Sequence, residues 1–200
     1  TNNAASAVAA TSGYVIGNLR RSISTTPATY TFAVGTASGT SSASFAFTAL
    51  SSGGTLMVTS NDGAGTNYPS NLHATKKLAR NWTVINGGLT GVSGSATFSY
   101  LAGDLAGGAS ATALKAYVYS GTASYATSTG TTGSSFTFNG LASFGEFGAG
   151  ECLGTLAATF TKTMASSCGG GADGSITASA SGGASPYSYS WTSTPSGFTA

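Results

Sequence analysis

The acidic side chains of this chain are few, and their spacing does not form an obvious acid–base pair. Acid–base and glycosidase chemistry needs two carboxylates that face each other across a cleft. All five acidic residues stand beside a glycine, and four of them lie in turn-like stretches, where a short acidic side chain caps the turn. Glu146 lies between Phe144 and Phe147 instead, and we expect it either to face solvent from an edge strand or to pair with Arg80 or Lys115. The five are Asp62, Asp104, Glu146, Glu151 and Asp173.

The histidine and the cysteines do not suggest a catalytic centre either. His73 is the only histidine, it lies in a stretch interpreted as a loop, and the chain has no GxSxG elbow for a Ser–His–Asp triad. Cys152 and Cys168 lack the further cysteines or histidines that a structural zinc site needs. They are expected either to form a disulfide in an oxidising compartment or to stay as free or partner-linked thiols. We therefore predict that the chain is not an enzyme.

One loop offers oxygen ligands for a cation. In "SNDGAGTN", residues 60–67, the side chains of Asn61, Asp62 and Asn67 are weak candidates for calcium ligands. Calcium takes six to eight oxygen ligands, and a single carboxylate is a meagre start for that shell. No other metal and no organic cofactor is expected.

Charge is scarce, and this limits the partners. Only 6% of the residues are charged, the net charge is +2, and the basic residues cluster only at Arg20–Arg21 and around Lys76, Lys77 and Arg80. Such a field is too weak to concentrate nucleic acid. The second cluster, with Trp82 nearby, either binds an acidic or sugar polymer or is incidental because Trp82 belongs to the core, and we favour the core interpretation.

A surface made of Ser, Thr, Asn and Gly lacks the like-charge repulsion that keeps soluble proteins apart. This predicts packing against copies of the same chain or against a surface polysaccharide, although weak selection on surface charge in a secreted domain would give the same composition. No window approaches the roughly 20 consecutive apolar residues of a membrane-spanning helix, so no transmembrane segment is expected.

The elements that position these residues are predicted to be strands. Short runs alternate apolar and polar residues, and clusters of Gly, Ser, Thr or Asn separate them. Within residues 71–80, "NLHATKKLAR", we expect one helical turn. The pattern predicts an all-β, antiparallel β-sandwich, Ig-like or jelly-roll-like, over residues 1–151. The clearest runs are Thr29–Val34, Ser44–Leu50, Thr55–Ser60, Ala79–Ile85, Ser95–Leu101, Ala113–Tyr119, Ser134–Phe138 and Ser143–Phe147.

A second, smaller β domain is predicted over residues 152–200. One or two strands are expected in residues 155–168, and "SITASASG" and "YSYSW" alternate again. In "YSYSW" the side chains of Tyr187, Tyr189 and Trp191 share one face. This aromatic stripe is either the core of its own small domain or an inter-subunit face that another copy covers.

Residues 168–191, "CGGGADGSITASASGGASPYSYSW", resemble the start of the SprB-type repeat of the gliding-motility adhesins of Bacteroidetes. In that repeat a cysteine and a glycine-rich turn precede "DGSI", a strand, "SGG", "PY" and "YSW". The resemblance implies that residues 152–200 hold an incomplete repeat, because further strands and commonly a second cysteine would follow.

The larger first part also resembles a known kind of domain. Stretches such as "YTFAVGT" (30–36), "RNWTVINGGLTG" (80–91) and "LASFGEFGAGE" (141–151) are similar to a β domain of very long surface proteins of the same bacteria. Those proteins typically leave the cell by the type IX secretion route, so the resemblance implies a secreted, extracellular or cell-surface location. It carries over no catalytic residue.

We therefore predict a structural extracellular surface protein. It would be a self-assembling filament, sheath or adhesin subunit whose copies join by β-strand pairing. The alternative is a carbohydrate- or surface-ligand-binding module of a long gliding or adhesion protein.

Overall fold

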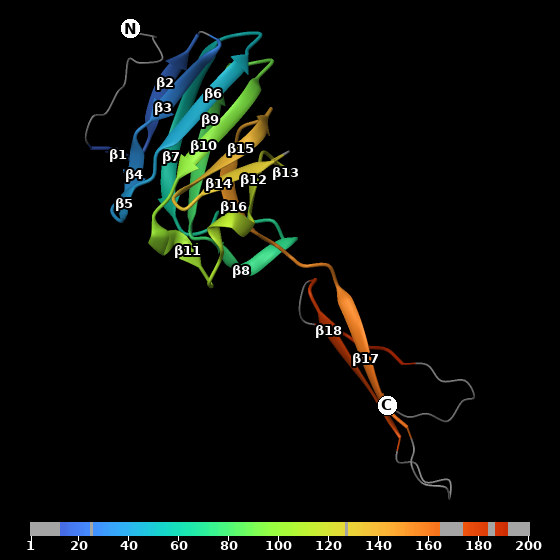
Figure 1. Cartoon of the computed structure of the whole chain (residues 1–200). Helices are drawn as coiled ribbons and strands as arrows, with labels where there is room; N and C mark the ends of the chain where they lie inside the picture. The colour runs from blue at the N-terminus through green and yellow to red at the C-terminus, as the bar shows by residue number, and fades with distance from the viewer. Residues whose placement is uncertain (1–12, 25, 127, 165–173, 184–186, 192–200) are drawn as a thin grey trace, which may run out of the picture. The chain divides into compact units, whose positions relative to one another are not determined.

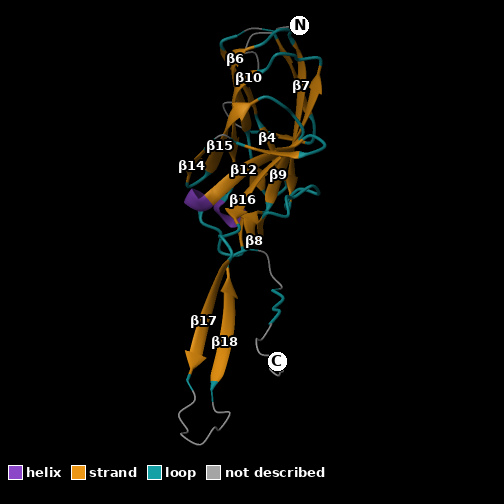
Figure 2. Ribbon diagram, turned by 90° about the vertical axis from the view of Figure 1, so that its right-hand side faces the viewer, coloured by secondary structure: helices purple, strands orange, loops and turns teal. Residues whose placement is uncertain are grey.

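The computed structural model describes residues 13–24, 26–126, 128–164, 174–183 and 187–191. The chain divides into two compact units, Thr1–Cys152 and Leu153–Ala200. The predicted domain boundary, between residues 151 and 152, stays a prediction. Within the described residues the regular elements are strands, apart from two 3₁₀ turns, which confirms the all-β fold class (Figure 2).

The first unit contains a five-stranded sheet in the order β14–β15–β10–β6–β3 (Figure 1). An eight-stranded sheet has the order β11–β8–β16–β9–β7–β2, with β12 on β16 and β13 on β12. The pairs in both sheets are antiparallel, whereas β1 pairs with β4 in parallel in a small ribbon completed by β5.

The five-stranded sheet consists of β3 (Ala28–Phe32), β6 (Ala43–Ala49), β10 (Ser93–Ser99), β14 (Thr129–Thr132) and β15 (Ser135–Leu141). The eight-stranded sheet consists of β2 (Leu19–Ile23), β7 (Gly54–Asp62), β8 (Leu72–Leu78), β9 (Arg80–Gly87), β11 (Leu105–Ala106), β12 (Leu114–Tyr119), β13 (Ala123–Tyr125) and β16 (Glu146–Cys152). The ribbon consists of β1 (Val15–Ile16), β4 (Val34–Thr36) and β5 (Gly39–Thr40), and the 3₁₀ turns are η1 (Ala102–Asp104) and η2 (Ala111–Ala113).

Aromatic side chains fill the space between the two sheets. The ring of Phe98 on β10 lies 4.9 Å, centroid to centroid, from both Trp82 on β9 and Phe147 on β16. All three side chains are fully buried, which confirms that Trp82 belongs to the core. Burying a ring of this size contributes about 1.5–3 kcal/mol to folding, so these contacts hold the sandwich together.

The eight predicted strands all have counterparts, and β6, β7 and β15 show most clearly the period-2 alternation of a half-buried strand. In β6, for example, Ala43, Phe45 and Phe47 are buried and alternate with partly exposed Ser44 and Ala46. The bounds shift by a few residues, and the stretch from Thr29 to Val34 divides between β3 and β4.

Several elements differ from the sequence-based expectation, and β8 and β2 are the longest of them in the first unit. The helical turn predicted within residues 71–80 is wrong, because Leu72–Leu78 forms β8, which pairs with β16 and β11. Only the two end residues of β8 are buried, so the strand shows no alternation. The sequence does not predict β2, because a charged residue such as Arg21 normally marks a surface position. In the structure Arg21 is only 5% exposed, and its guanidinium carbon lies 5.5 Å from the ring centroid of Tyr30.

Candidate interaction surface

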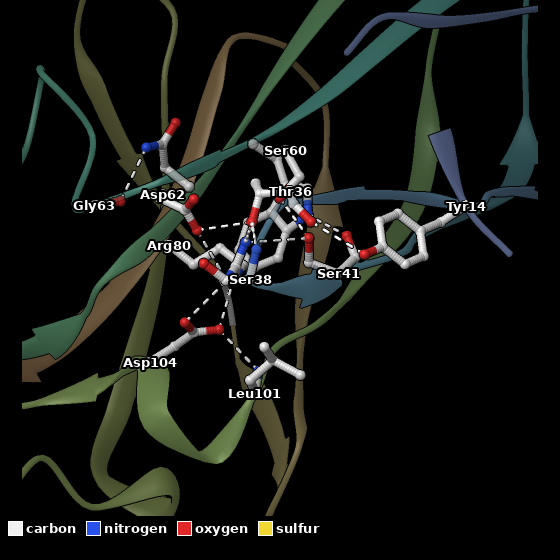
Figure 3. A network of polar contacts seen from close by, with 12 residues as sticks. Tyr14, Thr36, Ser38, Ser41, Ser60, Asp62, Gly63, Arg80, Leu101 and Asp104 are labelled. Atoms are coloured by element: carbon white, nitrogen blue, oxygen red, sulfur yellow. Dashed lines mark hydrogen bonds and ion pairs between the residues drawn. The ribbon is translucent and has the colours of Figure 1, made fainter. Parts of the chain in front are cut away.

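The most highly charged cluster of the first unit centres on the buried side chain of Arg80 (Figure 3). The Arg80 guanidinium donates to the Asp104 carboxylate from Nε at 2.6 Å and from a terminal nitrogen at 3.1 Å. It also lies 3.1 Å from Asp62 and donates to the hydroxyl of Thr36 at 3.1 Å. A paired and hydrogen-bonded guanidinium is the form in which a charge can be buried.

The hydrogen bonds and ion pairs of this cluster connect separate elements of the sandwich. Thr36 belongs to β4, Asp62 ends β7, Arg80 begins β9 and Asp104 ends η1. Asp104 also accepts a hydrogen bond from the Leu101 main-chain nitrogen, which caps the turn as expected for an acidic residue beside glycine. Because both carboxylates face one guanidinium, we interpret the cluster as structural and not as an acid–base pair.

The calcium candidates are already engaged with other side chains. The Asp62 carboxylate binds Arg80 and accepts from the Thr36 hydroxyl, and the Asn61 amide donates to Asn81. The Asn67 side-chain amide donates to the Glu146 carboxylate at 3.4 Å. A cation would have to compete with Arg80 for the only carboxylate of the three candidates. No group of three or more His, Cys, Asp or Glu side chains suited to a metal occurs among the described residues, and the calcium site stays an untested prediction.

Glu146 and His73 occupy different surroundings from those expected. Glu146 lies in β16, which has neighbours on both sides, and its carboxylate accepts from the main-chain nitrogens of Thr66 and Asn67 at 3.1 Å. The predicted edge position and the predicted pairing with Arg80 or Lys115 are therefore wrong, since Lys115 donates to a main-chain oxygen. The loop interpretation of His73 is also wrong, because this residue lies in β8.

The basic cluster does not form one patch. Arg80 is buried, Lys76 pairs with Glu151 at 3.8 Å, and the Lys77 ammonium lies 4.7 Å from the ring centroid of Tyr68. Burial is the main reason that the pKa of Tyr68 rises to about 12. The lysines therefore serve local contacts, and a polymer-binding role for this cluster gains no support.

The predicted disulfide cannot be placed, because Cys168 lies outside the described residues. Cys152 is exposed at the end of β16. Pairing of Cys152 with Cys168 stays a prediction.

The second unit is built around a hairpin of β17 (Ala157–Thr163) and β18 (Ser175–Ser181). The antiparallel register pairs Phe160 with Ala178 and Lys162 with Ile176. Since paired residues share a face, the hairpin has an apolar face and a hydroxyl face. The apolar face carries Ala158, Phe160, Lys162, Ile176, Ala178 and Ala180, and the hydroxyl face carries Thr159, Thr161, Thr163, Ser175, Thr177, Ser179 and Ser181.

The apolar face of the hairpin is largely uncovered. Phe160 is 67% exposed and Ile176 is 53% exposed, and all seven residues of β17 are exposed. A two-stranded hairpin by itself is marginally stable in water. Large apolar side chains that gather on an exposed surface mark a site of interaction, and we take this hairpin as the candidate interaction surface.

The aromatic segment 187–191 lies along the hairpin but is not a strand, contrary to the alternation of its sequence. The Tyr189 hydroxyl accepts from the Ala180 main-chain nitrogen at 3.1 Å, and the Tyr187 hydroxyl donates to the Gly182 main-chain oxygen. The Trp191 ring contacts Phe160 with centroids 6.3 Å apart. These residues thus cover part of their own unit, and their role as an inter-subunit face stays a prediction.

The tyrosine contacts also show which main-chain groups face outward. The Ala180 nitrogen and the Gly182 oxygen point away from β17, because they meet tyrosine hydroxyls at the outer edge of β18. Hydrogen-bonding direction alternates along an antiparallel strand. Across the hairpin, Ala158, Phe160 and Lys162 must therefore direct their main-chain groups to the outer edge of β17. No further strand pairs with that edge in the described part of the chain.

Residues 163–195 match the family model of the SprB repeat. The match begins at the last residue of β17 and includes β18 and the aromatic segment. Comparison with curated proteins and with solved structures found no match to the chain. No helix in the described ranges has the length and apolar character needed to cross a membrane. The repeat indicates an extracellular, adhesin-like protein of the cell surface.

Proposed function

We propose that the chain is a self-associating structural protein of the cell surface, whose copies join through β strands of the second unit. The observation that carries this proposal is the exposed hairpin, with its apolar face and an edge of β17 that pairs with no further strand in the described ranges. An unpaired edge strand is a template for pairing with another chain unless charge, proline or a covering segment blocks it. β17 has a single charged residue, Lys162, and no proline.

The scarcity of charge supports the same proposal. With 6% charged residues and a net charge of +2, two copies approach each other with little repulsion. We propose an adhesin subunit that associates in this way, and a filament or sheath would need a further contact surface.

The test measures self-association of the purified chain by sedimentation velocity and negative-stain electron microscopy over a range of concentrations. We expect concentration-dependent association that Phe160→Ser weakens about tenfold or more, since each copy loses one large apolar contact. Ile85→Ser is the matched control, because Ile85 is a 50% exposed strand residue of the first unit. A chain that stays monomeric at all concentrations, or equal effects of the two substitutions, would contradict the proposal.

Location is tested separately. Protease added to intact cells that produce the protein should degrade it while cytoplasmic markers survive. Protection of the chain until the cells are broken would contradict a surface role.

Carbohydrate binding is a second candidate, favoured by the exposed aromatic residues of the second unit. Tyr189 is 52% exposed and Trp191 is 38% exposed, and such rings can stack on sugars. Trp82 is fully buried, so a fluorescence change on adding a surface polysaccharide would report on Trp191. Saturable quenching that Trp191→Phe removes would support this function, and an unchanged spectrum would count against it.

A further inference from the structure

We propose that two copies pair antiparallel through the outer edges of β17, with Phe160 opposite its counterpart on a two-fold axis. This inference rests on the proposed function and names its partner, a second copy of the chain. The outer edge of β18 is a poorer template, because tyrosine hydroxyls already meet the main-chain groups of Ala180 and Gly182. β17 is therefore the edge at which a strand can be added.

The length of β17 selects the register. Phe160 is the central residue of Ala157–Thr163, so antiparallel pairing about Phe160 lets all seven residues of one strand face a residue of the other. The outward main-chain groups of Ala158, Phe160 and Lys162 then pair with those of Lys162, Phe160 and Ala158 of the second copy. These are hydrogen-bonded pairs, as the direction of their main-chain groups requires.

The side chains of β17 suit this self-pairing. The two Phe160 rings become cross-strand neighbours on the apolar face, and aromatic pairs of this kind are favourable. On the hydroxyl face Thr159 stands opposite Thr161 of the second copy, which is also a favourable cross-strand pair. Two short hairpins become one four-stranded sheet, and three or more strands with an apolar face reach a stability that a lone hairpin lacks.

Charge argues for the same register. Lys162 is the only charged residue of β17, and lysine commonly protects an edge strand from pairing. Pairing about Phe160 places each Lys162 opposite Ala158 and separates the two lysine positions by four residues along the strand, roughly 13 Å. A register centred on Lys162 would set the two ammonium groups directly opposite each other, which is destabilising. A two-fold contact also closes on itself, so this contact by itself gives a dimer.

Cysteine cross-linking tests the register while keeping Phe160. In a background with Cys152→Ser and Cys168→Ser, two single variants are prepared, Ala158→Cys and Lys162→Cys. Residues in a hydrogen-bonded antiparallel pair have Cα atoms about 5.5 Å apart, within the range that a disulfide spans. We expect an equimolar mixture of the variants to form disulfide-linked dimers under mild oxidation, and each variant alone to form few, because its own cysteines lie roughly 13 Å apart.

Charge substitution at one position gives a second test. Ala158→Glu places a carboxylate opposite Lys162 twice in the dimer and should strengthen association about two- to thirtyfold, and Ala158→Lys should weaken it by a similar factor. Association without cross-linking in the mixture, or equal responses to the two substitutions, would overturn this register and leave the proposed function standing. A chain that is monomeric at every concentration would overturn both.

Discussion

The two units treat charged and aromatic side chains in opposite ways. In the first unit, Arg80 is buried between two carboxylates and the ring of Phe98 is fully buried. In the second unit, Lys162 is exposed and Phe160 is 67% exposed. The first unit thus covers Arg80 and Phe98 with its own residues, whereas the second unit exposes apolar side chains and main-chain groups that a partner can cover.

The largest expected effect comes from removing the buried charge of the first unit. Arg80→Met leaves the Asp104 carboxylate buried without its guanidinium, and breaking a buried pair in this way costs about 3–5 kcal/mol. The measurement is guanidinium unfolding followed by Trp82 fluorescence in a Trp191→Phe background. Lys76→Met is the control, because the Lys76–Glu151 pair is partly exposed and contributes about 0–1 kcal/mol. Equal losses for both substitutions would show that the Arg80 cluster does not hold the sandwich together.

A smaller effect of opposite sign is expected inside the same unit. The Tyr117 hydroxyl is buried without a hydrogen-bond partner among the described residues, whereas the Tyr100 hydroxyl donates to the Thr132 main-chain oxygen at 3.1 Å. Tyr117→Phe should raise the free energy of unfolding by about 1 kcal/mol or more, and Tyr100→Phe should lower it by about 1 kcal/mol. Denaturant unfolding of both variants measures this, and a loss in both would show that Tyr117 has a polar partner.

The smallest expected effect is the response of the first unit to alkaline pH. Burial raises the pKa of Tyr68 to about 12 and also raises the pKa of Tyr117. Because the folded pKa lies above the unfolded value of about 10, each tyrosine stabilises the folded state fully below pH 10 and loses that contribution as the pH rises further. The melting temperature should fall above about pH 10, and Tyr68→Phe should make the fall shallower. An unchanged slope in that variant would contradict the assignment.

Much of the sandwich could be predicted, because its strands follow a local rule. The alternation in β6 and the burial of Trp82 follow from residues next to each other in the chain. β2 and the Arg80 cluster escaped prediction, since arginine usually marks a surface and its burial depends on carboxylates far along the chain. The partners of Glu146 are about 80 residues away, and no local pattern indicates them.

The hairpin could be predicted only in part. The alternation of "SITASASG" predicts β18, but it does not show which edge of the hairpin lacks a pairing strand. That depends on the register with β17 and on the hydroxyls of Tyr187 and Tyr189. The segment 187–191 alternates like a strand, yet it meets the edge of β18 with side chains instead of main-chain groups.

Residue-resolved amide hydrogen exchange of the full chain, at low and high protein concentration, tests the central claim most directly. The claim is that a second copy pairs with the outer edge of β17. It predicts that the amides of Ala158, Phe160 and Lys162 gain protection as the concentration rises. The amides of Ile176 and Ala178 face the other edge of the hairpin and should change less. Exchange at the three β17 amides that is the same at both concentrations would contradict the claim.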